Sequence, residues 1–310
     1  MKDLSFQLYS SMFLLFLSLR AKSKIEKPIL WLCDPIMFPL VICGKGLGYK
    51  VIWDHHELPP AKFLNIPILR SIFRFAYKVS DINIHANNER MDVLENRLVQ
   101  KAKNYLLMSN LPESFEPDEI RPTRLSDKFD TSRPFIYLQN SYSESRCGNE
   151  IMGALVESDI NVVCAGNFSE FQEQFFSKNK SYFSKKVYSV GYISKKEMNW
   201  LLSRCLCTII LYRNSSWNQW YCDPNRLYHS MIQGTNVITG SNPTIIGALK
   251  EFEYNCAITL DGDGANQEDI LQALNQIRNV DSKLNPSVKN LPLWKSYRKL
   301  LLSKLLELRF

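Results

Sequence analysis

The chain has 310 residues, which is enough for one large domain or two ordinary ones. A composition of 45% hydrophobic and 22% charged residues is that of a globular protein and excludes a disordered chain. The net charge of +7 favours anionic partners such as nucleotides or lipid phosphates, but no basic block with interleaved aromatic residues indicates nucleic acid.

The eight cysteines are scattered, with no C-x-x-C pair and no histidine at metal-ligand spacing. This pattern predicts a reduced, cytoplasmic chain with no metal site and no disulfide framework. No stretch approaches the roughly 18 apolar residues of a membrane span. Helical spacing of leucines from Leu4 to Ala21 predicts an apolar helix, which is either buried or in contact with a membrane.

Residues 1–112 are predicted to form the first of two domains, because short apolar runs alternate with helix candidates as in a doubly wound parallel sheet. The predicted strands are Ile29–Cys33, Lys50–Trp53, Ser80–His85 and Tyr105–Met108. The helix candidate Phe63–Val79 carries a basic stripe of Arg70, Arg74 and Lys78. Such a stripe lies against an anionic membrane or is a solvated face.

A cluster of titratable residues follows the second predicted strand. Asp54, His56 and Glu57 stand where the carboxyl end of a strand places ligand-binding groups in an open α/β sheet. We predict His56 as a catalytic polar group or base, with Asp54 and Glu57 orienting it.

Residues 113–134 are polar and predict an inter-domain linker. Residues 135–280 are predicted to form the second α/β domain. Its predicted strands are Phe135–Leu138, Asn161–Ala165, Val187–Val190, Leu206–Tyr212, Asn236–Thr239 and Asn255–Leu260. Residues 281–310 are predicted to form a tail and a basic amphipathic helix, which docks on a membrane or packs on the protein itself.

The stretch Tyr221–Pro243 predicts a loop, a helix, a glycine and a strand. Asp223 is the expected N-cap, Pro224 the expected first helical residue and Gly234 the expected terminator. Asn225 and Arg226 then lie at a helix N-terminus, where free backbone N–H groups and a guanidinium favour a phosphate. An ordinary crossover helix with a surface arginine is the alternative.

The segment Pro224–Gly234 resembles the nucleotide-sugar segment of GT-B glycosyltransferases of the family-four type. That family has a Lys that contacts the donor diphosphate, and Arg226 stands in its place. Two family carboxylates are replaced, by His229 and by Tyr221. The element Asp54, His56 and Glu57 also matches the family's Asp-x-His-Glu element position for position.

The resemblance implies an α/β, GT-B-like fold of two Rossmann-like doubly wound domains. It runs from about residue 25 to 280 and lacks the family's opening portion, so the N-terminal domain is expected to be incomplete, either trimmed or completed by a partner subunit or membrane surface. Trp217 offers a flat aromatic face that suits a sugar. The predicted donor-binding residues are Arg146, Gly166, Trp217, Asn225, Arg226, Tyr228 and His229.

Two functions follow as expectations. The first is a metal-independent glycosyltransferase, without a cofactor, that moves a sugar from a nucleotide-sugar donor to a lipid-linked or polysaccharide acceptor, in the cytoplasm or at the inner face of the membrane. The second is a catalytically weak subunit that binds a partner glycosyltransferase or the membrane, as the replacements at Tyr221 and His229 favour. An unrelated phosphate-binding α/β enzyme would need a dinucleotide loop, which the sequence lacks.

Overall fold

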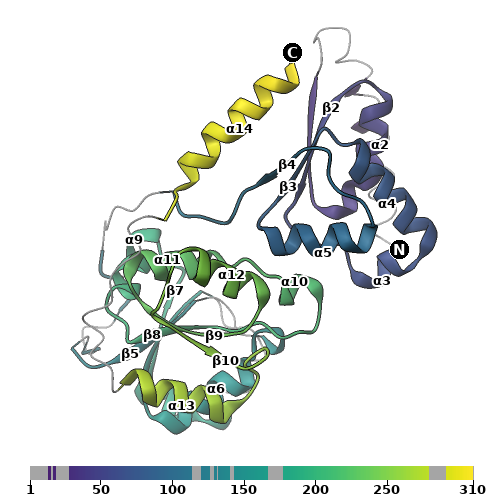
Figure 1. The fold of residues 1–310 in the computed structure, drawn as a ribbon. Coiled ribbons are helices and arrows are strands. Elements are labelled where there is room, and N and C mark those ends of the chain that lie inside the picture. Colours follow the sequence, from purple (N-terminus) through teal and green to yellow (C-terminus); the bar gives the residue numbers. More distant parts are fainter. Residues whose placement is uncertain are drawn as a thin grey trace. The chain divides into compact units, whose positions relative to one another are not determined.

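A computed structural model of the chain describes residues 13–14, 17–18, 28–113, 120–125, 129–130, 132–139, 143–166, 177–278 and 291–309. The predicted helix Leu4–Ala21 lies outside these residues except at 13–14 and 17–18, which are helical. The chain divides into two compact units, Met1–Asn110 with Trp294–Phe310, and Leu111–Leu293 (Figure 1). Within the described ranges, no helix has the length and hydropathy that a membrane span requires.

The first unit is built on a four-stranded parallel sheet in the order β1-β2-β3-β4. The strands are β1 (Ile29–Cys33), β2 (Lys50–His55), β3 (Ile82–His85) and β4 (Tyr105–Leu107). The helices are η1 (Pro35–Met37), α2 (Phe38–Gly46), α3 (Ala61–Asn65), α4 (Pro67–Val79), α5 (Asn88–Leu98) and α14 (Trp294–Arg309).

Side chains of successive strand residues cover opposite faces of this sheet. On one face, Ile52 and its neighbours on β3 and β4 pack against Leu301 and Leu305 of the C-terminal helix α14, drawn in yellow in Figure 1. On the other face, Trp53 packs on Phe73 of α4, with ring centroids 4.8 Å apart. The C-terminal helix is therefore part of the first unit.

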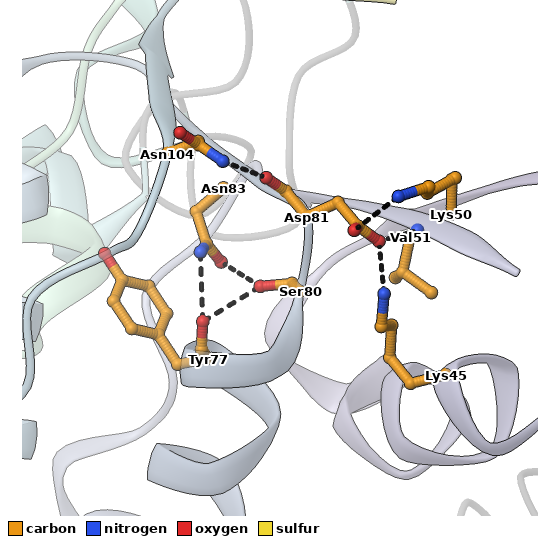
Figure 2. A network of polar contacts seen from close by, with 8 residues as sticks. All are labelled: Lys45, Lys50, Val51, Tyr77, Ser80, Asp81, Asn83 and Asn104. Atoms are coloured by element: carbon orange, nitrogen blue, oxygen red, sulfur yellow. Dashed lines mark hydrogen bonds and ion pairs between the residues drawn. The ribbon is translucent and has the colours of Figure 1, made fainter. Parts of the chain in front are cut away.

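Asp81 holds the amino ends of the strands together, as Figure 2 shows. Its carboxylate accepts hydrogen bonds from Lys45 Nζ and from the Val51 backbone N–H, each at 2.7 Å. Lys50 Nζ lies 3.6 Å from the other carboxylate oxygen, and the Asn104 side chain donates to the Asp81 carbonyl at 3.1 Å. Asp81 thus connects α2, β2 and the starts of β3 and β4 at the amino ends of the strands, opposite the carboxyl ends where the site is predicted.

The second unit has a six-stranded parallel sheet in the order β10-β9-β8-β5-β6-β7. Its strands are β5 (Phe135–Gln139), β6 (Asn161–Ala165), β7 (Val187–Gly191), β8 (Cys207–Ile210), β9 (Asn236–Gly240) and β10 (Ala257–Leu260). Its helices are η2 (Glu144–Arg146), α6 (Gly148–Ser158), α8 (Lys180–Lys186), α9 (Lys195–Leu202), α10 (Trp217–Trp220), α11 (Asn225–Gln233), α12 (Pro243–Glu251) and α13 (Gln267–Arg278).

Two apolar layers cover this sheet. One contains Ile136 and Leu138 of β5 with residues of α6 and α13, and the other contains Phe135 and Tyr137 of β5 with residues of α9. Leu125, from the segment predicted to be a linker, is buried in the second layer together with Phe129. The described part of that segment therefore packs on the second unit.

Helix α11 begins one residue later than predicted. Pro224 is its N-cap, and no side chain caps it. Asp223 is buried instead, and its carboxylate accepts a hydrogen bond from the Tyr228 hydroxyl at 2.6 Å. The Asp223 carboxylate therefore binds the Tyr228 hydroxyl and does not cap the helix. The predicted end of the helix is confirmed, because Gly234 closes it in the left-handed region with a φ of 66°.

Candidate functional site

The second sheet changes direction between β5 and β8. The chain passes from β5 outward through β6 and β7, then returns to the other side of β5 with β8. In open α/β sheets, ligands bind beyond the carboxyl ends of the strands at such a switch point. The segments that follow β5 and β8 are therefore the first place to look for a site.

Arg226 reaches this switch point from the first turn of α11. Its side chain donates hydrogen bonds to the carbonyl of Gln139, the last residue of β5, at 3.0 Å and to the Tyr212 hydroxyl, beyond β8, at 3.3 Å. The residue is only 7% exposed. Its neighbour Asn225 is exposed at the start of the helix, where backbone N–H groups and the helix dipole favour an anion.

Arg146, from the segment that follows β5, contacts the ring of the same tyrosine. It ends the short helix η2 after β5, and its guanidinium carbon lies 5.6 Å from the centre of the Tyr212 ring. The Asn242 side chain donates to the Tyr212 carbonyl at 3.1 Å and holds this residue in place. Tyr212 therefore brings the two predicted phosphate-binding arginines together.

Arg213 fixes the turn that carries Arg146, a role that the sequence analysis missed. Its Nε donates to the Glu144 carbonyl at 2.8 Å, and its backbone N–H donates to the Ser145 carbonyl at 2.9 Å. Its guanidinium also forms an ion pair with Glu150 in the first turn of α6. The pair Tyr212-Arg213 directly after a buried strand could have predicted this role. The sequence analysis instead assigned Tyr212 to the strand.

Tyr228 differs from the sequence-based expectation. It is 2% exposed, its hydroxyl is bonded to Asp223, and its ring lies edge-on to Phe252 with centroids 6.1 Å apart. These contacts place Tyr228 inside the unit, because it lies on the apolar face of α11. We assign it to packing and to holding the loop before the helix.

The remaining predicted donor residues lie on separate elements. His229 is half-buried on α11; desolvation and the nearby Lys195 ammonium lower its pKa to about 4, so its imidazole is neutral at pH 7. Gly166 follows β6 with a φ of 98° and donates its N–H to the Gly191 carbonyl at 2.7 Å. Trp217 is half-buried at the start of α10.

In the first unit, the structure brings Asp54 and His56 together. His56 Nε2 lies 3.4 Å from Asp54 Oδ2, and the histidine side chain is 59% exposed. Burial raises the pKa of the Asp54 carboxyl above its usual value, while His56 and a hydrogen bond from Trp31 offset part of that rise. Glu57 is exposed directly after this pair. Asp54 and His56 also line a small cavity of about 100 Å³.

The neighbouring residue His55 forms a buried pair with His85, which the sequence analysis missed. His55 and His85 are register partners on β2 and β3, and their buried rings stack 4.7 Å apart. The Asn83 amide donates to the Tyr77 carbonyl at 3.1 Å, so its oxygen faces His55 Nε2 at 3.1 Å and that nitrogen carries the proton. Burial lowers the pKa of His55 to about 4, which makes His55 a neutral structural group.

Solved structures resemble this chain closely in fold. HepE of Anabaena, in complex with UDP, aligns with a TM-score of 0.71 and 8% identity over 94% of this chain and 81% of its own. A glycosyltransferase of Rickettsia africae aligns with a TM-score of 0.64 and 12% identity over 98% of this chain and 78% of its own. WaaG, a glycosyltransferase involved in lipopolysaccharide biosynthesis, aligns with a TM-score of 0.60 and 10% identity over 92% and 79%. Neither a protein-family model nor a curated protein sequence matches the chain.

These likenesses establish the fold. The chain is an α/β protein with the GT-B fold, and its two parallel sheets have four and six strands within the described residues. The fold predicted from the sequence is confirmed, including the smaller sheet in the N-terminal unit.

Proposed function

We propose that the protein is a glycosyltransferase that takes a sugar from a nucleotide-sugar donor. The observation that carries the proposal is the meeting of Arg146 and Arg226 at Tyr212, beyond the carboxyl ends of β5 and β8. Departure of a nucleoside diphosphate leaves negative charge on the phosphates, and preorganised cations are the most effective way to stabilise it. The complex of HepE with UDP-glucose supports a donor of this chemical class.

Donor binding would use the two arginines differently. Arg226 is buried and already hydrogen-bonded to the protein, so its guanidinium is held in position before a ligand arrives. Arg146 is half-exposed, and its contact with Tyr212 leaves room for movement onto a phosphate. The start of α11, at the exposed Asn225, adds backbone N–H donors.

On the acceptor side, His56 would act as the polar group or base. It is exposed, and the Asp54 carboxylate lies 3.4 Å from its Nε2, close enough to orient the ring. The acceptor in this proposal is lipid-linked or a polysaccharide. Helix α4 supports a membrane-bound acceptor, because it exposes an apolar stripe of Ile68, Ile72 and Phe75 beside its basic residues.

A catalytically weak subunit is the second candidate, and the chemistry of His229 favours it. The family's carboxylate at this place would carry a negative charge, whereas His229 is neutral at pH 7. A chain that binds the nucleotide and does not turn over its sugar would fit this candidate.

Calorimetric titration with UDP, GDP and CMP tests the proposal. We expect one nucleoside diphosphate to bind the wild type and to bind Arg146→Ala and Arg226→Ala about 1.5–3 kcal/mol more weakly, because each change removes charged hydrogen bonds. Arg204→Ala is the matched control, since Arg204 is an exposed arginine of the same unit that lies over Trp200. Absence of binding by every nucleotide to the folded wild type would reject the donor site.

A further inference from the structure

Three side chains of different chemistry meet where β1 and β2 end. The sheet register pairs Cys33, the last residue of β1, with Asp54 of β2. His56 follows Asp54 by two residues and reaches back to its carboxylate at 3.4 Å. Cys33 Sγ, an Asp54 oxygen and a His56 ring nitrogen all lie within 4.8 Å of one another.

This set of atoms matches the preferences of one class of metal ion. Zinc is bound by thiolate, imidazole and carboxylate groups, usually four in number, and sites with three protein ligands keep the fourth position open. Magnesium and calcium prefer oxygen ligands and would gain little from Cys33. We propose that Cys33, Asp54 and His56 form a binding site for a zinc-class divalent metal ion, contrary to the sequence-based expectation that the chain has no metal site. With the ion bound, His56 is a ligand and does not act as the base proposed above.

The charges around Cys33 favour a cation there. The Asp54 carboxylate lies beside Cys33 in the sheet register, and Asp34 follows Cys33 directly in the chain. A divalent ion would relieve the repulsion among these groups. Binding replaces the thiol proton with a metal–sulfur bond and releases one proton to solvent.

The accessibility of the three groups also suits a ligand. Cys33 and His56 are exposed, so their side chains have the freedom to close the remaining distance to a tetrahedral arrangement. Asp54 is held in place, because it lies on β2 in register with Cys33 of β1 and its side chain is only 14% exposed. Asp54 and His56 also line the small cavity, which gives the open fourth position access to a small ligand.

Cobalt(II) is the probe, because its thiolate complexes absorb light where zinc complexes do not. The full chain, stripped of metals and kept reduced with a phosphine, is titrated with cobalt(II) and then with zinc(II). We expect one equivalent of cobalt to give a thiolate-to-metal charge-transfer band that zinc abolishes. Cys33→Ser should lose the band, and both Cys33→Ser and His56→Ala should bind zinc about 10-fold more weakly or worse, since even indirect partners of a metal are worth about that much.

Cys43→Ser is the matched control, because Cys43 is also an exposed cysteine of the first unit and lies outside the cluster. It should retain the band and the zinc affinity. A missing band in the wild type, or equal zinc affinity in the wild type and Cys33→Ser, would overturn the proposal. No nucleotide is present in this assay, so its result is independent of the outcome of the UDP titration.

Discussion

The Tyr212 hydroxyl accepts a hydrogen bond from Arg226 at 3.3 Å, across the switch point of the second sheet. If this bond positions the guanidinium for a diphosphate, Tyr212→Phe should weaken nucleotide binding by about 1 kcal/mol, roughly 5-fold. The Phe ring keeps the contact with Arg146, so the effect isolates the hydroxyl. Tyr188→Phe, a half-buried tyrosine elsewhere in the unit, is the calorimetric control. Unchanged affinity in Tyr212→Phe would show that the hydroxyl does not position Arg226.

Tyr228→Phe should lower stability and leave nucleotide binding unchanged. The variant removes the hydroxyl that donates to the buried Asp223 at 2.6 Å, and losing such a donor to a buried carboxylate costs about 1–3 kcal/mol. Urea denaturation measures the loss, and UDP calorimetry measures the affinity. A drop in affinity with unchanged stability would instead return Tyr228 to the donor-binding residues.

Local sequence patterns predicted the features that depend on local chemistry. The alternation of apolar runs and helix candidates gave the strands and the fold class, and Gly234 gave the end of α11. Ser194 and Glu197 have the spacing of a capping box, and the structure forms both of its hydrogen bonds. The helix end and the capping box depend on groups that are a few residues apart, and the strands on the apolar pattern of each short run.

Features that depend on distant partners were not predictable in the same way. Asp223 is different: it has the sequence of an N-cap, but its carboxylate accepts a hydrogen bond from Tyr228, a second local partner only five residues away. The role of Tyr212 depends on β8 lying beside β5, and that neighbour relation is set by the whole sheet. Likewise, the contact between Cys33 and Asp54 depends on the register of β1 on β2. The last two contacts join residues that are far apart in the sequence, so a local pattern could not predict them.

Asp81→Asn should destabilise the protein by about 1–3 kcal/mol, because the carboxylate binds two lysines and a backbone N–H at the strand starts (Figure 2). Its side chain is only 15% exposed. Asp159→Asn is the control: it breaks an ion pair with Lys186 whose carboxylate is 72% exposed, and such pairs contribute about 0–1 kcal/mol. Equal losses in urea denaturation would mean that Asp81 does not organise the first sheet.

His229 makes stability depend on pH. Its pKa falls from an ordinary value near 6.5 to about 4 on folding, so the unfolded chain binds the proton more readily. The contribution of His229 to the free energy of unfolding is complete above pH 6.5. As the pH falls toward 4 this contribution is lost, at a rate of at most about 1.4 kcal/mol per pH unit. His229→Gln should therefore flatten the pH dependence of urea denaturation between pH 7.5 and 5.5. Identical slopes in the wild type and His229→Gln would contradict this prediction.

Helix α4 should bind anionic vesicles through two neighbouring stripes. Ile68, Ile72 and Phe75 are exposed large apolar residues, and the exposed Arg74 and Lys78 lie beside them on the helix surface. Exposed apolar side chains enter the acyl boundary, while each basic residue near an anionic surface contributes about 1 kcal/mol. Co-sedimentation should therefore show binding to vesicles with phosphatidylglycerol and little binding to pure phosphatidylcholine.

Paired substitutions separate the two contributions to vesicle binding. Arg74→Glu with Lys78→Glu should weaken binding by roughly 20-fold or more at low salt and by less at high salt, where the charges are screened. Ile72→Ser with Phe75→Ser should weaken it at both salt concentrations, because burial of apolar area is insensitive to screening. Tyr192→Ser and Lys250→Glu, at exposed positions of the second unit, are the controls. Equal binding to neutral and anionic vesicles, or undiminished binding by both α4 variants, would contradict the prediction. The exposed face of α4 would then be a solvent-exposed surface that does not bind membranes.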